Sequence, residues 1–192
     1  MITMMIRVLI ADDHAVVRRG LKQILEETSD IVVSGEATNS REVLEQVSAK
    51  NWDVLVLDIT MPGRSGLDIL KEVKQLAPKL PVLVLSMHAE EQFASRVLKA
   101  GAAGYLPKES APEELVKAIR KISGGGRYIS SSQAEKLVYQ FEPGSDKMPH
   151  ETLSNREYEV LRLIASGKTI TQIAENVKLS VKTISTYRTR IL

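Results

Sequence analysis

The 192-residue chain contains no cysteine and no long apolar segment. Without cysteine, disulfide frameworks, thiol nucleophiles and cysteine-based zinc sites are excluded, and a reducing cytoplasm is the expected location. No run of about 18 apolar residues is present, so we expect neither a membrane-spanning helix nor a membrane partner. Residues 1–7 also lack the apolar core of a secretory signal.

The length of the chain is enough for two domains. Charge is distributed unevenly between its two parts. Residues 1–150 carry 19 Lys and Arg against 20 Asp and Glu, whereas residues 151–192 carry 7 against 4. This distribution indicates that a polyanionic partner would bind at the C-terminal end, although an ordinary solvated surface would show the same charge.

Short apolar runs alternate with longer amphipathic stretches in residues 1–123. Such apolar runs are typical of strands buried on both faces of a parallel sheet. The predicted strands are 6–11, 31–37, 53–58, 81–86 and 103–106. The predicted helices are 14–27, 40–50, 65–76, 90–100 and 112–122. This alternation predicts a doubly wound α/β domain that ends at the glycine run following residue 123.

Polar side chains follow four of these strands, at the carboxyl edge where open parallel sheets bind ligands. Asp12 and Asp13 follow the first strand, Asp58 ends the third, Ser86 ends the fourth and Lys108 comes just after the fifth. Three carboxylates repel one another unless a cation lies among them, and hard oxygen ligands suit Mg²⁺. One carboxylate could then form an aspartyl phosphate, while the ammonium and the hydroxyl bind the phosphoryl oxygens.

Other interpretations of these residues have less support. A Ser-His-Asp hydrolase built from Ser86, His88 and Asp58 would lack the G-x-S-x-G turn around the serine. A phosphatase with two aspartates flanking one residue would need an aspartate where Thr60 stands. A small Mg²⁺-dependent phosphohydrolase stays an alternative, which repeated turnover of a substrate would reveal. We expect His14 to be a polar residue at a helix start rather than a metal ligand.

The order and spacing of Asp12-Asp13, Asp58-x-x-Met61-Pro62-Gly63, Ser86 and Lys108 resemble the receiver domain of bacterial two-component response regulators, over about residues 5–123. The resemblance implies a flavodoxin-like (βα)5 sheet in strand order 2-1-3-4-5, with Asp58 as the phosphoacceptor of a sensor histidine kinase. It implies that Mg²⁺ is held by Asp12, Asp13, Asp58 and the backbone carbonyl of Thr60. Ser86 would be the switch hydroxyl, Tyr105 the aromatic ring that follows it, and Lys108 the phosphate-pairing ammonium. Beyond slow phosphorylation and dephosphorylation of its own aspartate, the chain would not be an enzyme.

Residues 124–150 differ in character from the first domain. They combine a glycine run, a short amphipathic stretch at 131–141 and a polar segment with proline and glycine. This composition predicts a linker that contains one short helix.

Residues 151–192 are helical in pattern throughout. A capping box at Ser154 and Glu157 opens one helix, residues 170–177 form a second, and Ser180 caps a third. Two short helices joined by a tight turn predict a helix-turn-helix whose last helix contacts DNA. A generic three-helix bundle with a solvated polar face would show the same pattern.

The third helix of this segment has an apolar stripe and a polar face. Val181, Ile184 and Ile191, with part of Tyr187 or Arg188, are predicted to face the core. The residues predicted to contact bases or phosphates of DNA are Lys182, Thr183, Ser185, Thr186, Tyr187, Arg188, Thr189 and Arg190.

Residues 153–192 resemble the NarL/LuxR-type DNA-binding domain, and a receiver joined to such a domain resembles NarL/FixJ-type response regulators. The resemblance implies a transcriptional regulator that dimerises on phosphorylation, binds a palindromic operator and can contact RNA polymerase. That family has a fourth helix after the DNA-reading helix, whereas this sequence stops at Leu192. We therefore expect the small all-α domain at 151–192 to lack its last helix and to bind DNA weakly. The alternative is a protein-interaction module whose receiver signals by protein contacts while the truncated tail is inactive.

Overall fold

The computed structural model of the chain describes residues 5–61, 66–87, 91–129, 153, 155–177 and 179–191. The chain divides into two compact units, residues 1–141 and 142–192, and each unit is described by itself. Two predictions, the Ser154 helix cap and the short helix at 131–141, lie outside the described residues.

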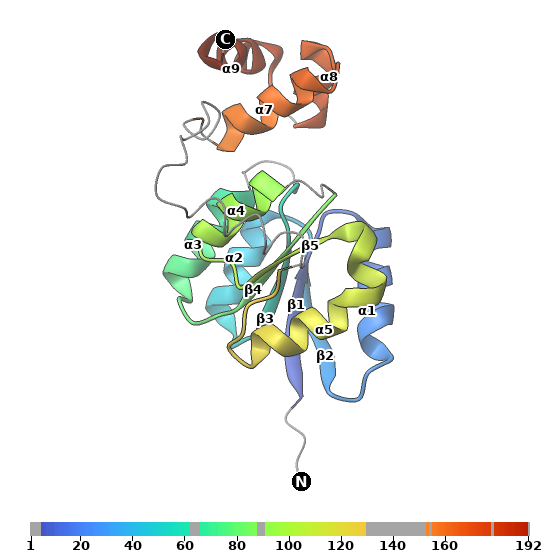
Figure 1. Ribbon diagram of the computed structural model, residues 1–192. Helices are drawn as coiled ribbons and strands as arrows, with labels where there is room; N and C mark the ends of the chain where they lie inside the picture. Colours follow the sequence, from blue (N-terminus) through green and yellow to red (C-terminus); the bar gives the residue numbers. More distant parts are fainter. Residues whose placement is uncertain are drawn as a thin grey trace, which may run out of the picture. The chain divides into compact units, whose positions relative to one another are not determined.

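The first unit is a parallel sheet with helices on both faces (Figure 1). Its strands are β1 (Ile6–Ala11), β2 (Ile31–Ala37), β3 (Val54–Asp58), β4 (Val82–Ser86) and β5 (Gly104–Pro107). Its helices are α1 (Ala15–Glu26), α2 (Ser40–Ala49), α3 (Gly66–Leu76), α4 (Glu91–Lys99) and α5 (Ala111–Ser123), and a 3-10 turn, η1 (Lys108–Ser110), follows β5. The strands lie in the order β2-β1-β3-β4-β5 and all pairs are parallel, so the predicted flavodoxin-like, doubly wound fold is confirmed.

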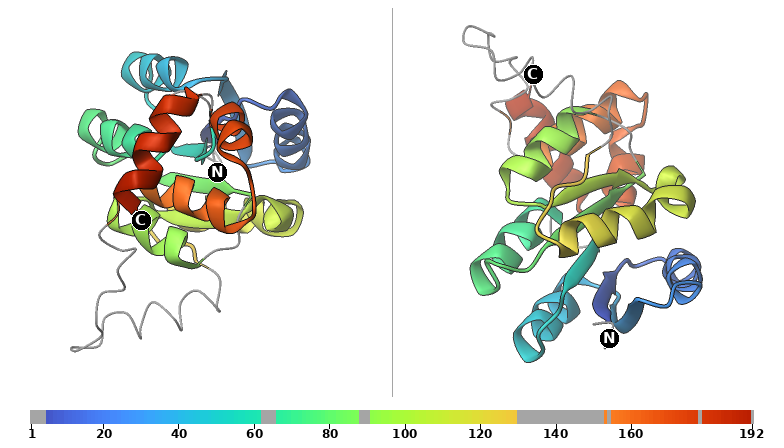
Figure 2. Two further views of the ribbon diagram at one scale, coloured as in Figure 1. Left: turned by 90° about the horizontal axis from the view of Figure 1, so that it is seen from above. Right: turned by 60° about the horizontal axis from the view of Figure 1, so that its bottom comes forward.

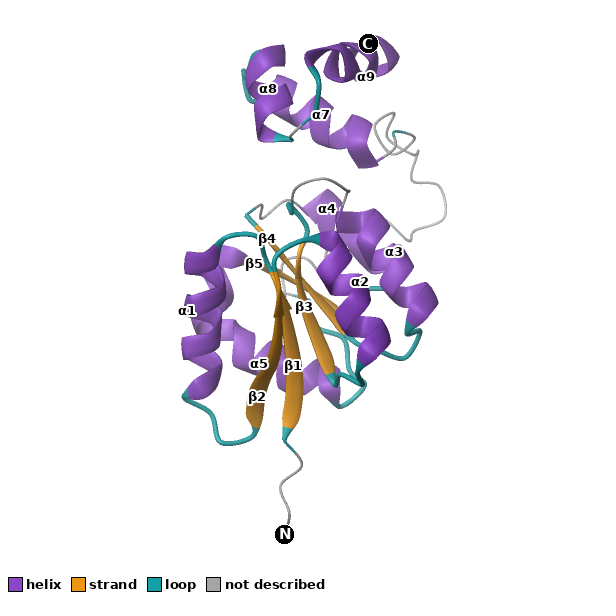
Figure 3. Ribbon diagram, turned by 180° about the vertical axis from the view of Figure 1, so that it is seen from behind, coloured by secondary structure: helices purple, strands orange, loops and turns teal. Residues whose placement is uncertain are grey.

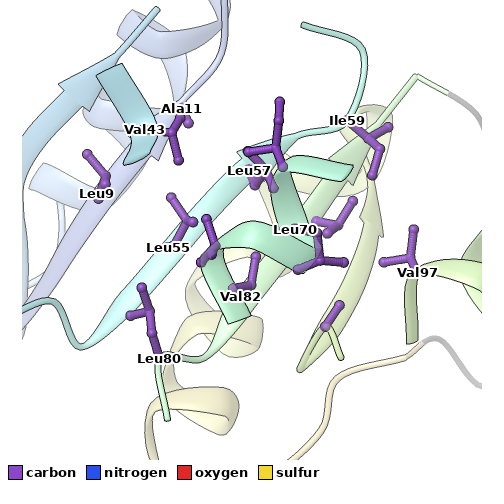
Figure 4. Close-up of a cluster of buried hydrophobic side chains, with 14 of the residues drawn as sticks. Leu9, Ala11, Val43, Leu55, Leu57, Ile59, Leu70, Leu80, Val82 and Val97 are labelled. Atoms are coloured by element: carbon purple, nitrogen blue, oxygen red, sulfur yellow. The ribbon is translucent and has the colours of Figure 1, made fainter. Parts of the chain in front are cut away.

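Two hydrophobic clusters lie on opposite faces of the sheet. Leu55 and Leu57 of β3 face α2, α3 and α4, where they join Leu70 of α3 (Figure 4). Val54 and Val56 of the same strand face α1 and α5. Figures 2 and 3 show the two groups of helices on opposite sides of the strands. Every residue of β3 and of β4 is buried, because successive side chains of a strand point to opposite faces and both faces are covered.

The packed body of the first unit extends beyond residue 123, where the sequence pattern predicted its end. Tyr128 forms a bridge to Gly104 at the free edge of β5. Its carbonyl accepts a hydrogen bond from the N–H of Tyr105 (3.1 Å), and its own N–H donates to the carbonyl of Ala103 (2.9 Å). The Tyr128 hydroxyl donates to Glu114 (2.8 Å), and burial together with this carboxylate raises the pKa of Tyr128 to about 12. After α5 the chain therefore returns to the sheet and forms hydrogen bonds with backbone groups that would otherwise be exposed along the edge of β5.

The described part of the second unit, from residue 153 onward, forms the helices α7 (Asn155–Ala165), α8 (Ile170–Asn176) and α9 (Val181–Ile191). Val160, Ile173 and Ile184, one from each helix, form the centre of its core. The predicted N-cap at Ser180 is confirmed, because its hydroxyl accepts a hydrogen bond from the N–H of Thr183 at 3.1 Å. The predicted helix-turn-helix arrangement is therefore present. Within the described residues, every helix falls short of the length and apolar character that a bilayer-spanning helix needs.

Candidate functional site

The predicted acidic residues meet at the carboxyl edge of the sheet. Asp12 follows β1 and Asp58 ends β3, and these two strands are neighbours. Asp12 is 1% exposed and Asp58 is fully buried. Lys108 begins η1, directly after β5, and its side chain is 8% exposed. The site therefore lies where crossovers from adjacent strands go to opposite faces, which is the usual ligand site of this class of sheet.

Lys108 joins the two buried carboxylates. Its Nζ lies 2.6 Å from Oδ2 of Asp12 and 2.8 Å from Oδ2 of Asp58. Burial by itself would lower the pKa of Lys108, but the charge and hydrogen bonds of Asp58 and Asp12 outweigh that effect and raise this pKa above its ordinary value. The ammonium is therefore held in its charged form at the position where the predicted phosphoryl group would bind.

The loop that carries Asp12 is held by short contacts. The N–H of His14 donates to Oδ1 of Asp12 at 2.8 Å, which is the local turn that aspartate favours before a helix. Arg18 of α1 donates from Nη1 to the carbonyl of Asp12 at 2.8 Å, and its Nε lies 3.3 Å from Glu36 at the end of β2. These contacts fix the loop between two neighbouring strand ends.

Thr60, whose carbonyl is a predicted metal ligand, orients the carboxylate of Asp58. The N–H of Thr60 donates to Oδ1 of Asp58 at 3.0 Å, and the Thr60 hydroxyl donates to the same oxygen at 2.8 Å. These bonds use the amide and hydroxyl of Thr60, whereas the predicted metal ligand is its carbonyl. The metal-binding role of Thr60 therefore stays a prediction.

Asp13 supplies the clearest indication of a cation site. Its Oδ1 is buried and has no hydrogen-bond partner among the described residues. Nδ1 of His14 lies 3.0 Å from this oxygen, which is ion-pair distance, without forming a hydrogen bond to it. A buried carboxylate oxygen without a hydrogen bond is costly. The ammonium of Lys108 pairs with Asp12 and Asp58, and no described contact joins it to Asp13. This excess of negative oxygen ligands fits a hard divalent cation such as Mg²⁺.

His14 lies closer to the acidic cluster than the sequence suggested. It occupies the N-cap position of α1, as expected for a residue at a helix start, and its side chain makes no capping bond. Four potential metal-ligand atoms lie within 4.8 Å of one another, one each from Asp12, Asp13, His14 and Asp58. The sequence pattern gave no sign of this position for the ring, because it depends on how the β1–α1 loop turns.

The two predicted switch residues, Ser86 and Tyr105, are buried. Ser86 ends β4 and is paired in register with Pro107, the residue before Lys108. Tyr105 lies in β5 and belongs to the hydrophobic cluster that faces α2, α3 and α4. Both therefore lie in strands next to the site, and their switching roles stay predictions.

The polar face of α9 is largely exposed, and its contact with DNA stays a prediction. The exposed members of the predicted DNA-contacting set are Lys182, Ser185, Thr186, Arg188, Thr189 and Arg190. Thr183 is partly buried, and its hydroxyl lies 2.7 Å from that of Ser180 in the helix cap. Tyr187 packs partly against the core. The guanidinium of Arg190 is 3.9 Å from Glu157 of α7.

The prediction that Val181 faces the core was wrong. Val181 is 47% exposed, whereas Ile184 is fully buried and Tyr187 and Ile191 pack beside it. Val181 is the first residue of α9. The core stripe of α9 therefore starts one turn later, at Ile184.

Comparisons with known proteins agree with this arrangement. Residues 8–120 match the family of response regulator receiver domains, and residues 151–192 match the luxR family of bacterial regulatory proteins. Response regulator UvrY of Escherichia coli O6:H1 is 38% identical over 97% of this chain and 86% of that protein. Response regulator GacA of Pseudomonas aeruginosa is 36% identical over 97% of this chain and 88% of that protein.

Solved structures of RcsB are similar over both units. RcsB of Salmonella enterica serovar Typhimurium, bound to the promoter rprA in the presence of the phosphomimetic BeF3⁻, has a TM-score of 0.66 and 30% identity, covering 97% of this chain and 90% of that one. A structure of two RcsB dimers on two parallel DNAs has a TM-score of 0.64 and 31% identity, and the match covers 97% of this chain and 89% of that one.

The sheet, the acidic cluster with its lysine and the helix-turn-helix unit define a two-component response regulator. The chain belongs to the NarL/FixJ-type response regulators, which join a receiver domain to a LuxR-type helix-turn-helix.

Proposed function

We propose that a sensor histidine kinase phosphorylates Asp58 and that phosphorylation controls DNA binding by the second unit. The observation that carries this proposal is the bridge from Lys108 to both Asp12 and Asp58, beside a buried oxygen of Asp13 that has no hydrogen-bond partner among the described residues. In the proposed reaction, a carboxylate oxygen of Asp58 attacks the phosphorus of the kinase phosphohistidine. The O–P bond forms as the N–P bond breaks, and the imidazole keeps the bonding electrons and takes up a proton.

The surrounding residues have separate tasks in this reaction. Asp12, Asp13, Asp58 and the carbonyl of Thr60 would hold Mg²⁺, which supplies positive charge beside the phosphoryl oxygens when it is bound. Lys108 is placed to pair with a phosphoryl oxygen, because its ammonium already lies 2.8 Å from Asp58. The only catalysis we propose is slow transfer of phosphate to and from Asp58.

Phosphorylation is proposed to act by shifting a conformational population. Ser86 would move toward the phosphoryl group and Tyr105 would follow, remodelling the surface formed by α4, β5 and α5. Phosphate favours this state only by interacting better with it than with the resting state. The remodelled surface would support a homodimer in the cytoplasm, and a dimer presents two copies of α9 to a palindromic operator, as expected for helix-turn-helix proteins. The DNA-bound RcsB structures support this part of the proposal. Contact with RNA polymerase would follow at the promoter.

The phosphoacceptor is tested by intact-mass spectrometry after incubation with a small phosphodonor and Mg²⁺. We expect a phosphoryl adduct on the unaltered protein and none on Asp58→Asn. Asp53→Asn is the matched control, because Asp53 lies at the other end of β3 and pairs with Arg7. An adduct of equal yield on Asp58→Asn would exclude Asp58 as the phosphoacceptor.

DNA binding is tested by selecting sites from random duplex DNA with the phosphorylated, full-length chain. We expect palindromic sites to be enriched. Lys182→Gln should weaken binding to all of them and reduce the salt slope by about one, because it removes one phosphate contact. Lys71→Gln, at an exposed position of α3, should leave the slope unchanged. Failure to enrich any site would favour the protein-interaction alternative.

A further inference from the structure

A cleft of about 390 Å³ lies at the amino-terminal end of the sheet. One wall runs from the end of α2 to Trp52, just before β3, and the other is the turn between α3 and β4. Asp58 lies at the opposite end of β3, so the cleft is separate from the candidate phosphorylation site. Its volume falls within the range of about 300–1,000 Å³ that is usual for small-molecule sites.

The first wall presents a fixed aromatic ring. Trp52 is 8% exposed, and its indole N–H already donates to the carbonyl of Gln46 at 2.9 Å. Gly35 of β2 approaches the same ring so closely that a Cβ atom there would lie 2.4 Å from its Cη2. Val47, 7% exposed, extends this wall. Because the polar end of the indole is satisfied and the ring is packed against Gly35, the apolar surface is formed before any ligand binds.

The second wall is fixed by the half-buried Lys74. Nζ of Lys74 in α3 donates to the carbonyls of Pro78 (2.6 Å) and Leu80 (2.9 Å). Burial lowers the pKa of Lys74. Leu80, 6% exposed, and Pro78 line the cleft. The ammonium of Lys74 therefore holds the turn in place, and Ala77, Pro78 and Leu80 supply the apolar part of this wall.

Two lysines bring positive charge to the cleft. Lys50 and Lys79 both line it and are exposed. Nζ of Lys50 lies 5.7 Å from the centre of the Trp52 ring, which keeps this ammonium beside the aromatic wall. Neither lysine forms an ion pair with a described residue, and the described lining of the cleft contains no acid. Apolar side chains beside two ammonium groups that have no ion-pair partner among the described residues suit a ligand of opposite charge.

We propose that this cleft binds a small organic anion with a flat apolar body, of the class of aromatic carboxylic acids. The body of the ligand packs between Trp52 and Leu80, and its carboxylate pairs with the ammonium of Lys50 or Lys79. This binding does not require phosphorylation of Asp58, so its test is independent of the proposed function.

The test uses the full-length, isotope-labelled protein and naphthalene-2-carboxylate as the probe. Trp52 is the only tryptophan, so its indole N–H gives a single resonance that reports on the cleft directly. We expect a saturable shift of this resonance, and weaker binding of the neutral naphthalene-2-methanol. Lys50→Gln and Lys79→Gln should each weaken binding of the carboxylate by about threefold, and the double variant by about tenfold, because each removes a partly exposed ion pair.

Lys117→Gln, on an exposed position of α5, is the matched control and should bind as the unaltered protein does. All these lysines are exposed, so the variants keep the fold, which circular dichroism checks. A Trp52 resonance that does not move with naphthalene-2-carboxylate would overturn the proposal. Equal affinity for the alcohol and the carboxylate, or an affinity that the double variant leaves unchanged, would also overturn it.

Discussion

Replacing Lys108 by methionine removes the ammonium that joins Asp12 and Asp58 and leaves the volume of the side chain nearly unchanged. With contacts of 2.6 and 2.8 Å, the gross attraction of each pair is about 6 kcal/mol at an effective dielectric constant of about 20. Desolvation of the buried charges offsets most of this, and breaking a buried ion pair costs about 3–5 kcal/mol in measured cases. We expect Lys108→Met to lower the free energy of unfolding of the first unit by about 3 kcal/mol when no divalent cation is present.

Mg²⁺ should reduce this loss. The two carboxylates left without Lys108 bind a cation more tightly, because the competing ammonium has gone. If the affinity for Mg²⁺ rises about tenfold, saturating Mg²⁺ returns about 1.4 kcal/mol to the variant relative to the unaltered protein. The ammonium and the metal would then be partly interchangeable as countercharges for Asp12 and Asp58.

The assay is urea unfolding followed by the fluorescence of Trp52, which lies in the first unit and therefore reports on that unit alone. Measurements are made with excess EDTA and with saturating Mg²⁺, and Lys117→Met serves as an exposed control. A loss below about 1 kcal/mol in EDTA, which is the size typical of exposed ion pairs, would refute the inference that these pairs stabilise the domain. A loss that Mg²⁺ leaves unchanged would refute the assignment of the cation site.

Three further predictions concern stability. The pKa of Tyr128 is raised to about 12 from an ordinary 10.0. Tyr128 should therefore stabilise the fold below pH 10 and lose that contribution as the pH rises toward 12. In an absorbance titration the last tyrosine ionisation should disappear in Tyr128→Phe, and its persistence in that variant would contradict the assignment. Gly66→Ala should lower the melting temperature, at a cost of about 1–3 kcal/mol, because a Cβ atom would lie 2.4 Å from the carbonyl oxygen of Ile59. Gly20→Ala, with nothing within 4 Å of that position, is its control, and equal melting temperatures would count against the steric reasoning. Ser180→Ala should cost the second unit about 1 kcal/mol by removing its N-cap bond, and helical circular dichroism that melts unchanged would show that the cap contributes nothing.

Local pattern predicted the elements of the first unit well, with small errors at their ends. The third strand begins at Val54 rather than at residue 53. The carboxylate of Asp53 accepts hydrogen bonds from the backbone N–H and the Nε of Arg7. At the start of α9 the predicted core residues were also partly wrong. Ile184 is buried as predicted, whereas Val181, the first residue of the helix, is half-exposed. Periodicity gives the face of a helix but not the point along it where the neighbouring elements begin to cover that face.

The order of the residues is enough to predict the sheet and the edge at which the polar residues gather. Continuous apolar runs require strands buried on both faces, and parallel strands bring the polar residues at their carboxyl ends together. Which atoms meet at that edge depends on the packing of the whole domain. The bond from Lys108 to Asp12 joins residues 96 positions apart, and the return of Tyr128 to the edge of β5 likewise depends on long-range packing. Hydrophobic periodicity records which side of each element is buried. The distances between side chains from different elements are set by packing of the whole domain, which no local pattern contains.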